Sequence, residues 1–163
     1  MVKSNYRFKT SVRVRWMECD AQGIVYNGAY LGYLEIGQAE YYRNLGFAIY
    51  TIPESGYIDF AVVKSTLEFK APAKVDEIIE LYVRVSKIGH SSLTLNMEIY
   101  PQGSDRLLTD IETIYVGYDA ATESSKPVPD DVRRLVTNYE ATGEILPMDQ
   151  LPDLSEAIAF TKK

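Results

Sequence analysis

One long segment of the chain has the hydrophobic period of an α-helix, and this segment constrains the fold more than any other feature. Its stripe recurs at spacings of four, three, four and four residues and consists of Tyr30, Leu34, Gly37, Tyr41 and Leu45. Such spacing places the stripe on one face of a helix. The sequence therefore predicts a helix over residues 29–45, which is about four and a half turns.

Both ends of this helix carry residues that helix ends prefer. Asn27 can cap the start, and Gly46 can adopt the left-handed conformation that follows a C-cap. Gly32 and Gly37 lie inside the helix, where each costs about 1 kcal/mol relative to alanine. We expect these two glycines to allow close packing of the helix against a sheet.

The other hydrophobic segments alternate with a period of two, which is typical of strands. The first covers residues 6–16, and its apolar side consists of Phe8, Thr10, Val12, Val14 and Trp16. Four more strands are predicted, at residues 57–69, 77–87, 91–100 and 107–118. The segment Ile88-Gly89-His90 is a tight connection that indicates an antiparallel hairpin. A short helix is predicted from Asp130 to Tyr139.

The order of one strand, one long helix and four successive strands indicates an α+β fold with a five-stranded antiparallel sheet. The helix can cover one face of the sheet, and the other face is solvated or covered by another subunit. We expect a single domain over residues 1–142. Residues 143–163 have two prolines and weak periodicity, and we expect them to form a C-terminal tail.

Composition excludes several function classes. The chain has 163 residues, of which 46% are hydrophobic and 25% charged, as in ordinary globular proteins. A net charge of −6 disfavours nucleic-acid binding, and no apolar run approaches the ~20 residues of a membrane span. Cys19 and His90 are the only residues of their types, so we expect no disulfide, no metal site and no cofactor. The N-terminus has no apolar secretory segment, so we expect a cytoplasmic protein.

The segment between the first strand and the helix carries the chemistry. Asp20 directly follows the predicted strand, and Asn27 stands seven residues later at the helix start. Helix-start N–H groups can donate to an oxyanion, and a carboxylate opposite them makes a minimal acyl-transfer site. By turn chemistry alone, Asp20 can equally be a turn former and Asn27 a plain helix cap.

The residues resemble a known family. The segment D-A-Q-G-I-V-Y-N-G-A-Y at residues 20–30 is similar to the signature of the 4-hydroxybenzoyl-CoA thioesterase-like hotdog family, which includes the Tol–Pal-associated acyl-CoA thioesterases. The resemblance continues through A-V-V-K-S-T-L-E-F-K-A-P-A-K-V-D-E at residues 61–77 and G-H-S-S-L-T-L-N-M-E-I at residues 89–99. It implies a hotdog fold, in which the sheet wraps around the long helix, and hydrolysis of an acyl-CoA thioester.

The resemblance also implies roles for single residues. Asp20 would attack the thioester carbonyl, giving an anhydride, or would activate water. The backbone N–H of Asn27 would polarise that carbonyl, and Tyr26 and Tyr30 would line the acyl pocket. Many relatives have histidine where this chain has Asn27. Glu35, inside the helix, is interpreted as a structural carboxylate, with a catalytic role as the alternative.

For the phosphates of CoA, the resemblance points to the hairpin between the third and fourth strands. The basic and hydroxyl residues of this hairpin are Lys87, His90, Ser91 and Ser92. The resemblance further implies a homo-oligomer, a dimer of the hotdog unit that commonly forms a tetramer. Two other functions stay open: a thioesterase for acyl-carrier-protein substrates, and a non-catalytic protein that binds acyl thioesters.

Overall fold

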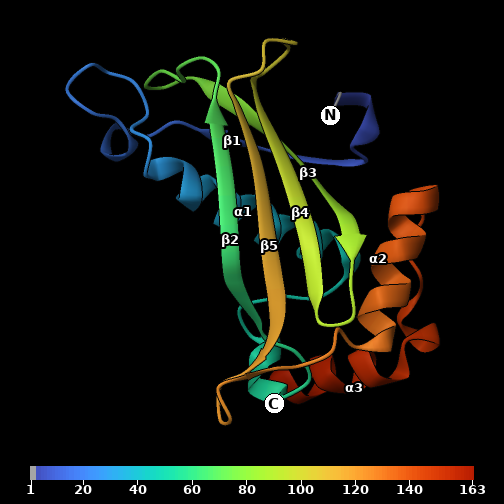
Figure 1. Cartoon of the computed structure of the whole chain (residues 1–163). Helices are drawn as coiled ribbons and strands as arrows, with labels where there is room; N and C mark the ends of the chain where they lie inside the picture. Colours follow the sequence, from blue (N-terminus) through green and yellow to red (C-terminus); the bar gives the residue numbers. More distant parts are fainter. Residues whose placement is uncertain (1–2) are drawn as a thin grey trace. The chain divides into compact units, whose positions relative to one another are not determined.

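The computed structural model describes residues 3–163 (Figure 1). The strands are β1 (Phe8–Arg13), β2 (Phe60–Phe69), β3 (Ile78–Ile88), β4 (Ser92–Pro101), β5 (Thr109–Asp119) and β6 (Ser124–Ser125). The helices are α1 (Ala29–Leu45), α2 (Asp130–Thr142) and α3 (Pro152–Thr161). Four short 3₁₀ helices also occur in this range: η1 (Lys3–Asn5), η2 (Trp16–Glu18), η3 (Ile52–Ser55) and η4 (Met148–Gln150).

The strands form one antiparallel sheet in the order β1-β3-β4-β5-β2, and the two-residue strand β6 pairs with β5. Figure 1 shows β2, β5, β4 and β3 side by side. β1 is antiparallel to β3, with Phe8 opposite Val83 and Arg13 opposite Ile78. The predicted α+β class and the five main strands are confirmed. β6 was not predicted, because two residues are too few to show an alternating hydrophobic pattern.

The chain divides into two compact units, and each is described by itself. The first contains the described residues up to Tyr41, with Thr66–Arg84 and Asn96–Glu112. Here α1 packs closely on β3 and β4, because a Cβ on Gly37 would lie 2.7 Å from Met97 Sδ and 3.0 Å from Val83 Cγ2. The expectation for Gly37 is therefore confirmed. The expectation for Gly32 is wrong within the described residues, since nothing lies within 4 Å of a Cβ there.

The predicted first strand was too long at its C-terminal end. Burial alternates through β1 as predicted, but the strand ends at Arg13 and Trp16 begins η2 with 79% of its surface exposed. The backbone N–H of Arg15 donates to Glu18 Oε2 at 2.8 Å, and the Arg15 side chain contacts the same carboxylate. This local turn replaces strand geometry and directs Trp16 away from the core.

The second unit contains Tyr42–Ser65, Val85–Leu95 and Thr113–Lys163. α1 ends in this unit at Leu45, and Gly46 follows with the predicted left-handed conformation at φ +114°. The buried apolar residues of α2 are Val132, Leu135, Val136 and Tyr139. α2 begins at Asp130 as predicted and continues three residues beyond Tyr139 to Thr142.

Residues 143–163 are more regular than the sequence indicated, because they contain η4 and the ten-residue helix α3. Asp131 Oδ2 accepts the backbone N–H groups of Asp153 and Leu154, at 2.8 and 3.1 Å, and so caps α3. That cap comes from a distant residue, which local sequence signals do not show. The division into a domain of residues 1–142 and a tail of residues 143–163 stays a prediction. None of the helices described is both long and apolar enough to cross a membrane.

Candidate active site

Asp20 lies in a closed turn between η2 and α1. Its backbone N–H donates to Ile24 O at 2.9 Å, and its backbone oxygen accepts from Gly23 N–H at 3.0 Å. Gly23 has a φ of +75°, which glycine adopts without strain. The turn is held to the segment before β3, because Val25 N–H donates to Ala73 O at 2.9 Å.

One of the two carboxylate oxygens of Asp20 accepts a hydrogen bond. Oδ1 accepts the backbone N–H of Gln22 at 2.8 Å, which fixes the side chain relative to its own turn. For Oδ2, residues 3–163 provide no hydrogen-bond partner, and the side chain is exposed. Asp20 is thus a turn former, the structural role considered above, and it still presents one oxygen to the outside of the turn.

Asn27 lies two residues before the start of α1. Its Oδ1 accepts the backbone N–H of Gly28 at 3.0 Å, and its backbone oxygen accepts from Tyr30 N–H at 3.4 Å. The Asn27 backbone N–H itself has no hydrogen-bond partner among the described residues. This N–H therefore stands free at the positive end of a 17-residue helix.

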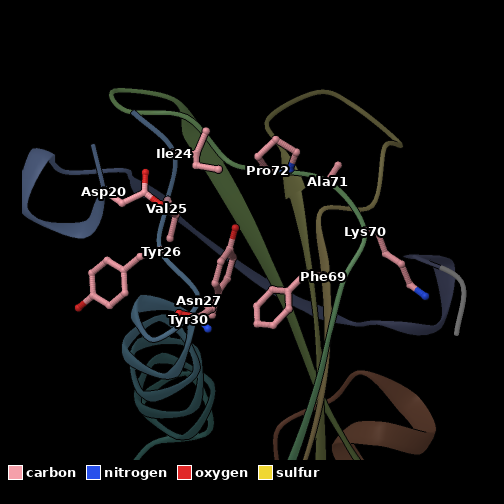
Figure 2. A pocket seen from close by; sticks show the side chains of 10 residues that line it. All are labelled: Asp20, Ile24, Val25, Tyr26, Asn27, Tyr30, Phe69, Lys70, Ala71 and Pro72. Carbon is pink, nitrogen blue, oxygen red and sulfur yellow. The ribbon is translucent and has the colours of Figure 1, made fainter. Parts of the chain in front are cut away.

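Asp20 and Asn27 line the same pocket, which has a volume of about 410 Å³ (Figure 2). All residues of the pocket belong to the first unit. Its full lining is Asp20, Ile24, Val25, Tyr26, Asn27, Tyr30, Phe69, Lys70, Ala71 and Pro72. Four residues singled out in the sequence, Asp20, Tyr26, Asn27 and Tyr30, are therefore brought together.

The two tyrosines of the pocket differ in their surroundings. Tyr30 is buried, and its ring lies 5.3 Å from that of Phe69. Tyr26 is 45% exposed, and in Figure 2 its ring points away from the ring of Tyr30. Tyr30 and Phe69 thus form the aromatic wall, whereas Tyr26 lies at the rim.

The segment Phe69–Pro72 is a part of the pocket that the sequence did not place beside Asp20 and Asn27. It begins at the last residue of β2 and reaches the pocket because Ile24 and Lys74 form an isolated antiparallel bridge. In the sequence this segment lies within residues 61–77, which resemble the family, and no pocket role was predicted for it. The available signal was Pro72 shortly after a predicted strand, which indicates a loop whose side chains can face a neighbouring loop.

Glu18 lies next to the site without lining the pocket. Burial alone would raise its pKa. Hydrogen bonds from Arg15 N–H, from the Tyr33 hydroxyl and from the Arg15 side chain outweigh that effect and hold the pKa of Glu18 below its usual value. Burial and the bond to Glu18 in turn raise the pKa of Tyr33, so its hydroxyl stays protonated and can donate.

The predicted CoA-binding residues do not line the pocket. Lys87, His90, Ser91 and Ser92 belong to the second unit, around the connection between β3 and β4. Gly89 N–H donates to Ser92 O at 2.7 Å, which closes the predicted hairpin. Lys87 and His90 are exposed there. Glu35 is exposed on α1 and does not line the pocket either.

Comparison with known proteins places the chain among thioesterases. The model of the thioesterase-like superfamily matches residues 14–136. The acyl-CoA thioester hydrolase YbgC of Escherichia coli O6:H1 is 26% identical over 125 residues, which cover 77% of this chain and 92% of that protein. The putative acyl-CoA thioesterase YneP of Bacillus subtilis is 26% identical over 121 residues, 74% of this chain and 84% of that protein.

Solved structures show the same fold. The 1,4-dihydroxy-2-naphthoyl-CoA thioesterase Slr0204 from Synechocystis matches with a TM-score of 0.74 and 18% identity, over 80% of this chain and 96% of that one. The hypothetical protein TT1821 from Thermus thermophilus matches with a TM-score of 0.72 and 26% identity, over 79% and 96%. Because the family match covers more than half of the chain and the sheet and helix have the predicted arrangement, this protein belongs to the thioesterase-like superfamily and has its hotdog fold.

Proposed function

We propose that this protein hydrolyses the thioester of an acyl-CoA to a carboxylic acid and CoA. One observation carries the proposal: Asp20 and Asn27 line one pocket, and neither Oδ2 of Asp20 nor the backbone N–H of Asn27 has a hydrogen-bond partner in residues 3–163. Membership of the thioesterase-like superfamily and the similarity to YbgC support a thioester as the substrate.

The Asn27 N–H would bind the carbonyl oxygen of the thioester. Negative charge develops on this oxygen when the carbonyl carbon becomes tetrahedral, so a donor fixed beforehand stabilises the transition state more than the ground state. The positive end of α1 adds to the same effect. Removing one such donor typically costs about 100-fold or more in rate.

Asp20 would act by one of two routes. As a nucleophile, its oxygen bonds to the carbonyl carbon, the C–S bond breaks, and water then hydrolyses the anhydride. As a general base, it takes a proton from water, the water oxygen bonds to the carbon, and the proton passes to the leaving thiolate. Both routes consume one water and give an acid and a thiol. A single turnover in ¹⁸O-water tests the nucleophilic route, because ¹⁸O enters the Asp20 carboxylate only when water attacks the aspartyl carbon of an anhydride.

The acyl group would lie against the aromatic wall formed by Tyr30 and Phe69, with Tyr26 at the rim. Aromatic faces provide large apolar contact areas and also stack on planar groups. The pocket volume of about 410 Å³ is at the lower end of the usual range for small-molecule sites.

The phosphates of CoA would bind at the β3–β4 hairpin through Lys87, His90, Ser91 and Ser92. The exposure of Lys87 and His90 supports this role. The test is the double variant Lys87→Ala/His90→Ala with an acyl-CoA and with the matching acyl-pantetheine, which lacks the phosphates. We expect a higher KM for the acyl-CoA alone; equal changes for both substrates contradict the assignment.

We further propose that the protein is a homo-oligomer in the cytoplasm, a dimer of the hotdog unit that assembles into a tetramer. β2 is an edge strand of the sheet, and Val62 and Val63 on it are 57% and 58% exposed. Edge strands with exposed apolar residues readily pair with a second chain. Light scattering on the purified protein tests the assembly.

The single free thiol of Cys19 is consistent with a reducing compartment.

The experiment that tests the activity is thiol release from short, long and aromatic acyl-CoAs by the wild type and by Asp20→Asn. Asparagine can still accept the Gln22 N–H, so the turn is kept while the free carboxylate is lost. We expect a loss of at least about 100-fold. Asp149→Asn, at an exposed position in η4, is the matched control.

Two other functions are distinguished when acyl-carrier-protein thioesters and a thioester-binding measurement are added to this experiment. Release from acyl-carrier-protein thioesters but not from acyl-CoAs would indicate the other carrier. Binding of thioesters without thiol release would indicate a non-catalytic protein, and wild-type activity of Asp20→Asn would remove the mechanism proposed here.

A further inference from the structure

Glu18 connects three parts of the chain around the candidate site. Its side-chain Oε2 accepts the hydroxyl of Tyr33 at 2.6 Å, and the same oxygen accepts the backbone N–H of Arg15 at 2.8 Å. Its Oε1 accepts Arg15 Nε at 2.8 Å. Its backbone oxygen accepts the N–H of Tyr26 at 3.1 Å.

These contacts lie where they can set the geometry of the two groups in the pocket. Glu18 stands two residues before Asp20, and Tyr26 directly precedes Asn27. The main-chain bond from Tyr26 to Glu18 therefore closes the loop that holds both groups. Tyr33 lies one turn into α1 and is buried, so its hydroxyl ties this loop to the rigid helix.

The strength of the tie follows from its chemistry. The Glu18 side chain is only 12% exposed, and its carboxylate accepts hydrogen bonds from a phenol, an amide and a guanidinium. Hydrogen bonds to an ionised acceptor are shorter and about twice as strong as neutral ones. An ion pair on the exposed surface would hold the loop far less firmly.

We propose that Glu18, held by Tyr33, is a positioning residue that fixes Asp20 relative to the Asn27 N–H. The inference rests on the proposed function, because it assigns Glu18 a task in that reaction. Glu18 itself does not line the pocket. A misplacement of about 1 Å in a reacting group can cost on the order of 100-fold in rate. Loss of one of the several hydrogen bonds that Glu18 accepts should therefore lower kcat by roughly 10-fold.

The principal test is Tyr33→Phe, which removes only the hydroxyl that Glu18 accepts. We expect kcat to fall by roughly 10-fold with KM within about 3-fold of wild type, because the residues lining the pocket are unchanged. The matched control is Tyr6→Phe. The Tyr6 hydroxyl is also buried in the first unit, but it has no hydrogen-bond partner in the described chain. That control should keep wild-type kcat and KM.

Amide hydrogen exchange gives a second readout that does not depend on activity. We expect Tyr33→Phe to speed exchange in peptides covering residues 16–28, the Tyr26 amide included, and to leave peptides from β3 and β4 unchanged. Glu18→Gln serves as a second variant, since it keeps the shape but loses the charge. It should change kcat and local exchange in the same direction. If Tyr33 and Glu18 act through the same hydrogen bond, the double variant Tyr33→Phe/Glu18→Gln should have a kcat no lower than that of Glu18→Gln alone.

Each outcome decides the inference. A wild-type kcat in Tyr33→Phe, or faster exchange spread evenly over all peptides, overturns the positioning role. If the wild type released no thiol from any substrate, the proposed function would fail, and the exchange data alone would show whether Glu18 holds the loop. If Asp20→Asn is inactive while Tyr33→Phe is fully active, the proposed function stands and the positioning role falls.

Discussion

Gly37 of α1 faces Met97 of β4 so closely that an added Cβ would lie 2.7 Å from the methionine sulfur. Val83 crowds the same point from β3 at 3.0 Å, and Met97 is fully buried. The helix approaches the sheet this closely at a residue that has no side chain, and a Cβ there would force Met97 or Val83 to shift. This approach sets the depth at which the N-terminal part of α1 lies on the sheet in the first unit.

We predict that Gly37→Ala lowers the free energy of unfolding, although alanine is the better helix former. Overpacking in a filled core costs about 1–3 kcal/mol, whereas the gain in helix propensity is about 1 kcal/mol. The matched control is Gly32→Ala, where no atom lies within 4 Å. It should stabilise the protein by up to about 1 kcal/mol. Thermal unfolding measures both, and a rise in Tm for Gly37→Ala contradicts the packing argument.

A second prediction concerns the attachment of α3. Asp131→Ala removes the acceptor for the N–H groups of Asp153 and Leu154, so α3 should fray. We expect a loss of about 0.5–2 kcal/mol and faster proteolysis within residues 152–161. Asp130→Ala changes the neighbouring, exposed carboxylate and provides the control. Equal proteolysis of the two variants would show that Asp131 does not hold α3.

The elements that could be predicted from the sequence are those whose determinants are local. α1 has the predicted bounds because its hydrophobic stripe and the glycine after its last residue are local features of the sequence. The bounds of the five main strands agree with the prediction to within three residues at either end. Trp16 was placed wrongly because a contact between Arg15 and Glu18 ended the alternation. α3 was missed because its cap comes from Asp131, 22 residues away.

A third prediction separates the side chain of Asn27 from its backbone. Asn27→Ala keeps the backbone N–H and removes only the acceptor for Gly28 N–H, which is exposed and can bind water instead. We expect kcat/KM to stay within about 5-fold of wild type, far from the loss of about 100-fold or more predicted for Asp20→Asn. Thiol release measures both variants. A loss of similar size in Asn27→Ala would assign catalysis to the amide side chain.

A fourth prediction concerns the aromatic wall of the pocket. Phe69→Ala removes the ring that packs against Tyr30. We expect kcat/KM for aromatic or long acyl-CoAs to fall by roughly 10-fold relative to acetyl-CoA, because only the larger groups reach this wall. Phe160→Ala is the control, since Phe160 on α3 is 54% exposed and Phe69 is 52% exposed. Equal losses for all acyl groups would show that Phe69 has no part in selecting them.

The pocket itself was only partly predictable, for a physical reason. Asp20 and Asn27 belong to one short loop, so their closeness in space follows from their closeness in the sequence. Phe69–Pro72 joins them through the bridge between Ile24 and Lys74, which connects segments about fifty residues apart. Such a long-range contact cannot be recognised from the hydrophobic pattern of either segment. Glu18 was overlooked for a related reason, because its partner Tyr33 lies fifteen residues away on another element.

The last prediction follows from the ionisation of Glu18. Its pKa is lowered in the folded protein, so the carboxylate contributes stability above its unfolded pKa of about 4.5, and this contribution is lost as the pH falls through the folded value. Wild type should therefore lose stability on acidification more steeply below about pH 4.5 than Glu18→Gln, which carries no charge there. Denaturant unfolding between pH 7 and pH 3 measures the difference, with Glu156→Gln at an exposed position of α3 as the control. Parallel curves for wild type and Glu18→Gln would show that the ionised carboxylate does not stabilise the loop.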